Sequence, residues 1–257
     1  MAKGPRSPRP PAEGFRLFSL SGIPLVIHPS WLLSVMILTL FTYPVIALPL
    51  FRGSSRTVLV VAALVSVIPV AASIVAHELA HALVARAHGM RCDQITLFAF
   101  GGVSQIVGLA KRPQIEYQVA IAGPILSLVV ATTLAGIART LEPAAEGLSG
   151  AWGAYAWINL ALAVFNLIPA FPMDGGRILR SILWRVTGAR GRATRWAARV
   201  ARAFATGLIV LGVFVLLEPL GRGSSPDAGG LWTMLIGTFL FSAAGVAEET
   251  EGGDDPR

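Results

Sequence analysis

Residues 57–81 read TVLVVAALVSVIPVAASIVAHELAH, a stretch whose first 20 residues are uncharged and whose end is a His-Glu-x-x-His motif. An apolar run of this length is typical of a helix that crosses a bilayer. Residues four apart lie on one face of a helix, so His77 and His81 can both point at one metal ion, with Glu78 beside them. This arrangement is the geometry of a zinc-dependent hydrolase, although so short a motif also arises by chance.

The whole chain is as apolar as this stretch. Of its 257 residues, 54% are apolar and 14% are charged, and its mean hydropathy is +0.67, which is too apolar for an ordinary soluble domain. The formal charge of +7 does not indicate a nucleic-acid partner, because the basic residues fall between the apolar runs. A single cysteine, Cys92, excludes an intramolecular disulfide. The composition therefore predicts an all-α integral membrane protein in contact with the lipid bilayer.

Six apolar stretches approach the roughly 20 residues that cross a bilayer. We expect transmembrane helices at about 30–51, 57–88, 115–138, 151–173, 197–217 and 231–247. They form a membrane core over residues 17–247, preceded by a flexible basic arm, 1–16, and followed by an acidic tail, 248–257.

The basic residues also predict the orientation of the spans. With a cytosolic N-terminus, 17 Lys and Arg residues lie on the cytosolic side and 4 on the other. The positive-inside rule then places both termini in the cytosol. The stretch 177–202 becomes the main cytosolic loop, with its arginines facing anionic lipid. We expect a multi-pass protein of the cell membrane, with its site toward the cytosolic side.

A strand-forming segment lies between the second and third spans. Residues 95–107 read ITLFAFGGVSQIV and predict a β-hairpin that turns at Gly101 and Gly102. Non-helical backbone at membrane depth is tolerated where it packs on protein, so we expect a short re-entrant hairpin, with an ordinary surface loop as the alternative.

The His-Glu-x-x-His motif requires a further ligand. His77 precedes Arg86 by nine residues, which places it on the order of 14 Å from the helix end. Ionisable groups at that depth are costly, and a bound dication would offset the cost. A catalytic zinc takes three protein ligands, and the acidic residue that meets this need is Asp174, in NLIPAFPMDGG at 166–176. The alternatives are that Glu78 pairs with a histidine across a helix seam and that Asp174 merely caps a helix.

These two motifs, in this order and on separate spans, resemble those of the site-2 protease family of intramembrane zinc metalloproteases. The resemblance covers about residues 20–190, and Met173 departs from the leucine usual in the family. It implies one Zn²⁺ per chain, held by His77, His81 and Asp174. It also implies that Glu78 is the catalytic glutamate and that Asn166 lies near the substrate or the developing oxyanion. Relatives often carry a PDZ domain or a pair of CBS domains; neither is recognisable here, so we expect a minimal form.

The resemblance implies regulated intramembrane proteolysis, the hydrolysis of peptide bonds within or next to a transmembrane segment of a membrane-protein substrate. The hairpin, including Gly101 and Gly102, could hold an unwound substrate by pairing with it as a strand. A metal-ion transporter and an inactive scaffold for membrane helices are the alternatives. The identity of the substrate, the need for a prior cleavage and assembly as a homo-oligomer stay open. Glu116 is interpreted as a first-turn acid that stabilises the third span.

Overall fold

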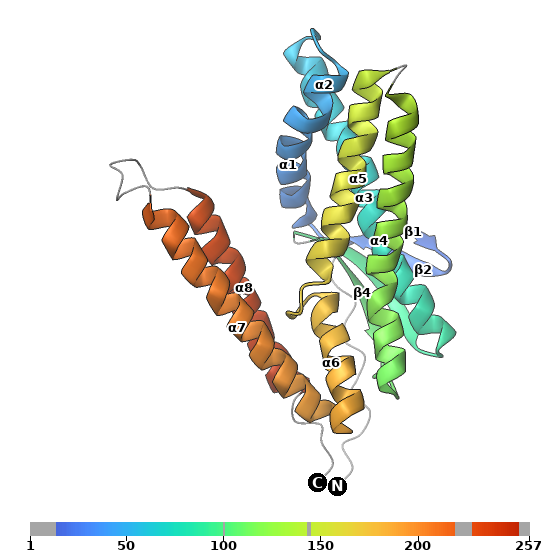
Figure 1. Ribbon diagram of the computed structural model, residues 1–257. Coiled ribbons are helices and arrows are strands. Elements are labelled where there is room, and N and C mark those ends of the chain that lie inside the picture. The colour runs from blue at the N-terminus through green and yellow to red at the C-terminus, as the bar shows by residue number, and fades with distance from the viewer. Residues whose placement is uncertain (1–13, 100, 143–144, 219–227, 252–257) are drawn as a thin grey trace. The chain divides into compact units, whose positions relative to one another are not determined.

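The computed structural model describes residues 14–99, 101–142, 145–218 and 228–251, and it is mostly helical (Figure 1). The helices are α1 (Trp31–Thr42), the π-helical η1 (Tyr43–Ala47), α2 (Leu48–Leu50), α3 (Arg56–Ala87), α4 (Pro113–Leu141), α5 (Glu146–Asn166), α6 (Asp174–Thr187), α7 (Arg190–Leu217) and α8 (Ala228–Glu251). The strands are β1 (Phe15–Leu20), β2 (Ile23–Ile27), β3 (Arg91–Phe98) and β4 (Gly101–Val107). The chain divides into two compact units, unit 1 up to Leu109 with Leu126–Leu160, and unit 2 with Ala110–Ile125 and Ala161 onward.

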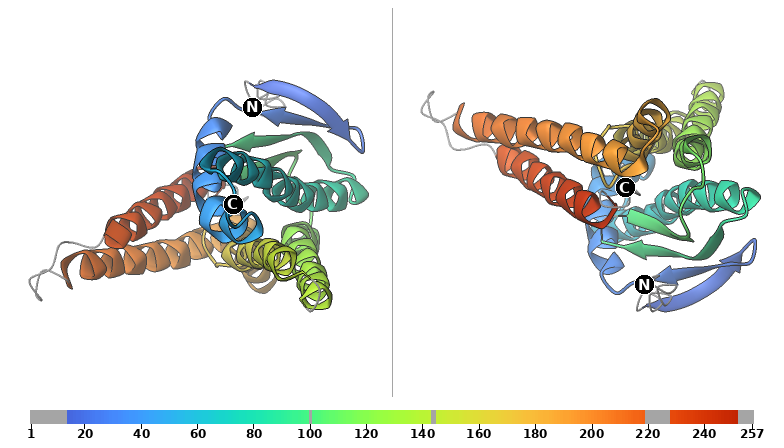
Figure 2. Two further views of the ribbon diagram at one scale, coloured as in Figure 1. Left: turned by 90° about the horizontal axis from the view of Figure 1, so that it is seen from above. Right: turned by 90° about the horizontal axis from the view of Figure 1, so that it is seen from below.

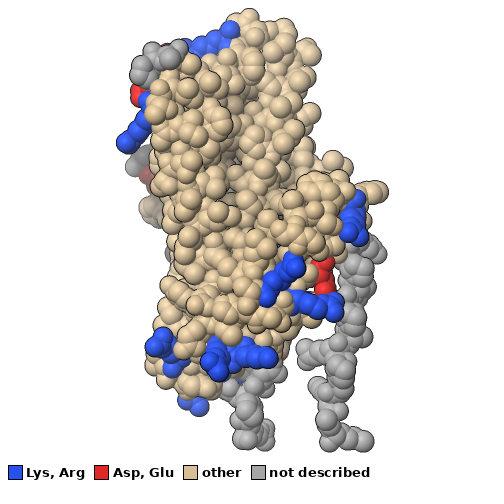
Figure 3. Space-filling view, turned by 90° about the vertical axis from the view of Figure 1, so that its right-hand side faces the viewer, with Lys and Arg blue, Asp and Glu red and all other residues tan. Residues whose placement is uncertain are grey.

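In the part of the chain that the structure describes, six helical stretches are long and apolar enough to cross a membrane, as the sequence predicts. They are Trp31–Leu50, Arg56–Ala87, Pro113–Leu141, Glu146–Asn166, Arg190–Leu217 and Ala228–Thr250. Large apolar side chains on these helices are exposed, among them Leu32, Ile68 and Phe214. On the face drawn in Figure 3, Lys and Arg stand in separate groups with wide uncharged surface between them. Such a surface suits lipid better than water.

The expectation of an all-α fold with one hairpin is too narrow, because unit 1 contains a four-stranded sheet of order β1-β2-β3-β4. β1 and β2 form one antiparallel hairpin, β3 and β4 form another, and β2 pairs with β3 in parallel. The strands lie beside α3 in both views of Figure 2. Buried Ile23, Leu25, Ile95 and Leu97 pack with Val75 of α3 in one apolar cluster.

The predicted hairpin at 95–107 is present but longer, and its glycines do not form the turn. Gly101 and Gly102 begin β4, where they pair with Phe98 and Leu97. Gly101 has φ of 124°, a backbone conformation that favours glycine. The residues between the strands are Ala99 and Phe100, and Phe100 lies outside the described residues.

Two boundaries differ from prediction in the second half of the chain. The fourth span ends at Asn166 rather than near 173, ahead of Pro169 and Pro172, which disfavour a continuous helix. The stretch 177–202 is helical rather than a loop. Its polar residues gather on one side of α6, and they occupy the first turns of α7 ahead of that helix's apolar part.

In unit 2, α7 and α8 run alongside each other (Figure 1). Small residues permit this close approach: a Cβ added at Gly230 would lie 2.6 Å from the Gly212 carbonyl oxygen. Of the predicted arm and tail, residues 1–13 and 252–257 lie outside the described residues, and 248–251 complete α8.

Candidate metal centre

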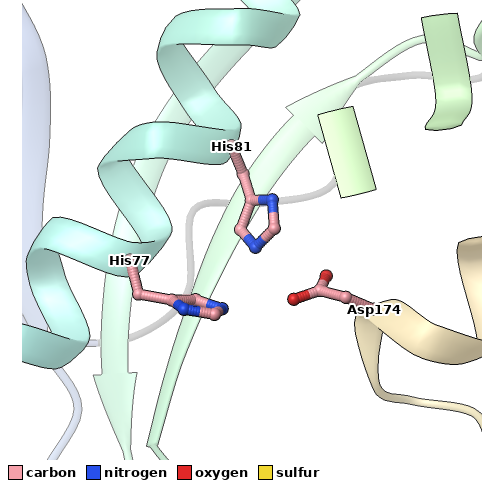
Figure 4. Close-up of side chains that lie close together, drawn as sticks. All are labelled: His77, His81 and Asp174. Atoms are coloured by element: carbon pink, nitrogen blue, oxygen red, sulfur yellow. The ribbon is translucent and has the colours of Figure 1, made fainter. Parts of the chain in front are cut away.

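Two buried histidines occupy adjacent turns of α3. His77 and His81 are each 3% exposed. Their ring centroids are 4.9 Å apart, and the ring planes are inclined at 78°. Figure 4 shows both rings projecting from the same side of the helix. The spacing of four residues therefore brings the two imidazoles together as predicted, within a helix that is otherwise apolar.

A serine on α4 holds the first of these rings. Ser127 is 2% exposed, and its Oγ lies 2.9 Å from His77 Nδ1. With Nδ1 engaged by the hydroxyl, Nε2 is the ring atom that can bind a metal. Metal-binding histidines usually have such a partner on the second nitrogen, which orients the ring.

The carboxylate of Glu78 turns toward the sheet rather than toward a histidine partner. Glu78 Oε2 accepts a hydrogen bond from the Ser104 backbone N–H at 2.9 Å and lies 2.7 Å from Ser104 Oγ. The same hydroxyl lies 2.8 Å from the Glu78 carbonyl oxygen. These contacts do not support the alternative in which Glu78 pairs with a histidine across a helix seam.

Asp174 belongs to unit 2, where it is the first residue of α6 and is 7% exposed. A tight turn precedes it: a Cβ at Gly175 would collide with the carbonyl oxygens of Leu167 and Ile168, and one at Gly176 would lie 2.8 Å from the Ala170 carbonyl carbon. These two positions therefore need glycine because the turn folds back over the start of α6. Arg177 Nη1 lies 3.9 Å from Asp174 Oδ1. Asp174 is thus a buried first-turn residue and not the N-cap, which is Met173.

Asn166 ends α5, and its Nδ2 donates to the Leu162 carbonyl oxygen at 2.9 Å. This hydrogen bond lies within α5. It does not test the predicted role of Asn166 toward the substrate, which stays a proposal.

Glu116 does lie in the first turn of α4, as predicted, but that interpretation is incomplete. Glu116 is 2% exposed, and its Oε1 accepts from Arg180 Nε at 2.6 Å. Its Oε2 lies 3.6 Å from Arg190 Nε. Arg180 also lies over the Phe171 ring, 5.4 Å from its centroid. Within unit 2, one buried carboxylate thus joins the start of α4 to α6 and α7.

Three polar residues near the motif are not among the site residues expected from the sequence. Ser104 and Ser127 contact Glu78 and His77, and Asn159, 1% exposed, donates from Nδ2 to Ser73 Oγ at 3.0 Å. Asn159 was detectable, because an amide in the middle of an apolar span is uncommon. The two serines carried no such signal, since small hydroxyl residues are frequent in membrane helices and strands.

Cys92 on β3 is not suited to metal binding. Burial raises the pKa of its thiol to about 11, with smaller contributions from the Asp93 and Glu78 carboxylates. A thiol with this pKa stays protonated near neutral pH. Because the thiolate is the form that binds metals, Cys92 is a poor metal ligand.

The model of peptidase family M50 matches residues 65–143 and 134–208 of the chain. These segments hold both histidines, Glu78 and Asp174 and make up more than half of the sequence. The chain belongs to peptidase family M50, and it is a multi-pass membrane protein.

Two curated relatives and one solved structure are similar to it. "Putative zinc metalloprotease sll0528" of Synechocystis sp. is 39% identical over 236 residues, which cover 91% of this chain and 59% of that protein. "Putative zinc metalloprotease Rip3" of Mycobacterium tuberculosis is 44% identical over 176 residues, 67% of this chain and 43% of that protein. The chain thus spans about three fifths or less of these relatives. The site-2 protease from Methanocaldococcus jannaschii matches with a TM-score of 0.58 and 26% identity, covering 92% of this chain and 95% of that chain.

Proposed function

We propose that this chain is a zinc metalloprotease that hydrolyses peptide bonds within or next to a transmembrane segment of a membrane-protein substrate. The observation that carries the proposal is the buried histidine pair, with a carboxylate between them in sequence, on a membrane-spanning helix of an M50 family chain. The names of the relatives, which describe zinc metalloproteases, support the same chemistry.

The proposed zinc ligands are His77, His81 and Asp174. Two imidazoles and one carboxylate are a donor set that zinc takes in hydrolases, with a fourth position for water or substrate. Each of the three offers one ligand atom, an imidazole nitrogen from each histidine and a carboxylate oxygen from Asp174. The contact between Ser127 and His77 supports the assignment, because it directs Nε2 toward metal binding.

Glu78 is the proposed general base. When bound, zinc supplies a Lewis acid that polarises the scissile carbonyl and acidifies water. Glu78 takes the proton of the attacking water and returns it to the leaving amine, as a carboxylate within hydrogen-bond reach of both can do. Asn166, at the end of α5, would steady the substrate or the developing oxyanion.

The substrate would bind as an extended strand. A transmembrane helix hides its carbonyl groups in hydrogen bonds, so it must unwind before attack. β4, with Gly101 and Gly102 at its start, is an edge strand of the sheet, and edge strands can pair with added strands. Proline at Ile106, further along the same strand, should then slow cleavage of a helical substrate more than that of an unfolded one. Equal effects on both would exclude this role.

The proposal also includes the location of the chain and its orientation in the membrane. The excess of Lys and Arg on one side supports a cell-membrane protein with both termini in the cytosol and the site toward the cytosolic side. The core would extend over residues 17–247.

A cleavage assay tests the function. The purified chain in dodecyl maltoside should cleave fluorescent casein, an unfolded protein, and co-expression should cleave members of a library of tagged single-span proteins. A zinc chelator should stop the first reaction, and added zinc should restore it. Zinc transport into vesicles without cleavage would favour the transporter, and binding of single-span proteins without cleavage would favour the scaffold.

Ser127→Ala should weaken zinc binding by about 10- to 100-fold, the usual cost of removing a hydrogen-bond partner of a metal-binding histidine. Zinc affinity can be measured by competition with a fluorescent chelator. Thr132→Ala is the control, because that hydroxyl is exposed on the same helix and donates within it. Identical affinities in both variants would show that Ser127 does not orient His77.

A further inference from the structure

We infer that Ser104 is a positioning residue that fixes the carboxylate of Glu78 for proton transfer. The inference rests on the proposed function, in which Glu78 is the general base. It assigns to β4 a task separate from binding substrate, because the strand would also hold part of the catalytic machinery.

The contact between strand and helix is unusually close at this point. A Cβ added at Gly102 would lie 2.7 Å from Glu78 Cγ and 3.0 Å from Ile74 Cγ2. Glycine at 102 therefore lets β4 approach α3 until the main chain at Ser104 reaches the carboxylate. This explains glycine at 102 by packing, independently of any turn.

The hydrogen bonds fix one oxygen of the carboxylate. Within the described chain, the Glu78 carboxylate is contacted by the Ser104 amide and by the Ser104 hydroxyl, and both contacts reach Oε2. The amide, together with the hydroxyl when its proton turns toward Oε2, restrains this oxygen, and neither Ser104 contact reaches Oε1. A general base needs only one oxygen for the proton, and its geometry must be held closely for fast transfer.

The hydroxyl also ties the side chain to its own backbone. Ser104 Oγ lies within hydrogen-bond distance of both Oε2 and the Glu78 carbonyl oxygen, and its single proton can serve either. The amide of Ser104 donates to Glu78, so it is already used and does not donate to an added strand. A substrate pairing with this edge would thus lie directly beside the base.

The test is a set of kinetic constants on fluorescent casein for Ser104 variants. Ser104→Ala should lower kcat by about 10-fold, the worth of one charge-assisted hydrogen bond, with KM unchanged. The decrease is limited because the backbone amide still donates. Ser104→Thr and Ser104→Val form a matched pair of similar shape, and only the variant with the hydroxyl should keep near wild-type kcat.

Three further measurements separate positioning from general damage. Zinc content should stay at the wild-type level in all Ser104 variants. Thr132→Ala, at an exposed hydroxyl of α4, should leave kcat unchanged. In the absence of substrate, Glu78→Ala should speed hydrogen exchange at the β4 amides, because the Ser104 N–H loses its acceptor.

The outcomes distinguish this inference from the proposed function. If Glu78→Gln is inactive while Ser104→Ala and Ser104→Val keep full kcat, the inference fails and the function stands. If the Ser104 variants change only KM, or lose zinc, Ser104 is not a positioning residue for Glu78. If Glu78→Gln remains fully active, the assignment of the base fails, and the role of Ser104 fails with it.

Discussion

Glu78→Gln should lower kcat on fluorescent casein by about 10²- to 10⁴-fold, the range that general acid–base catalysis supplies. Glutamine has nearly the same shape as glutamate, and its amide oxygen can still accept from the Ser104 N–H. It cannot take up a proton near neutral pH, so the binding geometry persists while proton transfer is lost. We therefore expect KM to change little and zinc content to remain at one ion per chain.

The matched control for this variant is Glu146→Gln, which makes the same chemical change at an exposed position in the first turn of α5. It should leave kcat unchanged. Cleavage products that form at the wild-type rate with Glu78→Gln would remove Glu78 from the mechanism. Loss of zinc in that variant would instead indicate that Glu78 supports the ligands.

The parts of the site that follow from sequence are those with a helical period or a rare composition. His77 and His81 could be paired because four residues make one turn, and their burial followed from the apolar run before them. Asp174 stood out as the acidic residue expected at membrane depth on the same side as the two histidines. The six spanning stretches were recognisable by length and hydropathy alone.

The contacts that tune these groups could not be predicted in the same way. The Ser104 contact depends on how closely β4 approaches α3, and the Ser127 contact depends on the rotation of α4 against α3. The parallel pairing of β2 with β3 joins segments about 70 residues apart, and no local pattern encodes it. Hydroxyl groups are too frequent in such segments for composition to identify the useful ones.

Glu116 shows how a correct local rule can mislead. Acids in the first turn of a helix do interact favourably with the helix dipole, and Glu116 occupies that position in α4. Its burial and its arginine partners come from α6 and α7, which begin about 60 residues or more further along the chain. Nothing in the sequence around Glu116 indicates these arginine partners.

Glu116→Ala should lower the free energy of unfolding by about 3–5 kcal/mol, because it removes the negative member of a buried ion pair while the positive members stay buried. Here two guanidinium groups, those of Arg180 and Arg190, would lose their shared carboxylate. The measurement is an unfolding titration in mixed micelles of dodecyl maltoside and SDS. Glu116→Gln should fall between wild type and Glu116→Ala, since its amide can still accept from Arg180.

Glu146→Ala is again the control, because Glu146 is an exposed acid in the first turn of another span and should cost at most about 1 kcal/mol. Equal losses at the two positions would restore the interpretation of Glu116 as a dipole acid. The double variant Glu116→Leu with Arg180→Met gives a further distinction. If the loss in Glu116→Ala comes from an uncompensated buried charge rather than from missing attraction, removing Arg180 together with its partner should recover a large part of the stability. The remainder would measure Arg190, which stays buried without the carboxylate in either case.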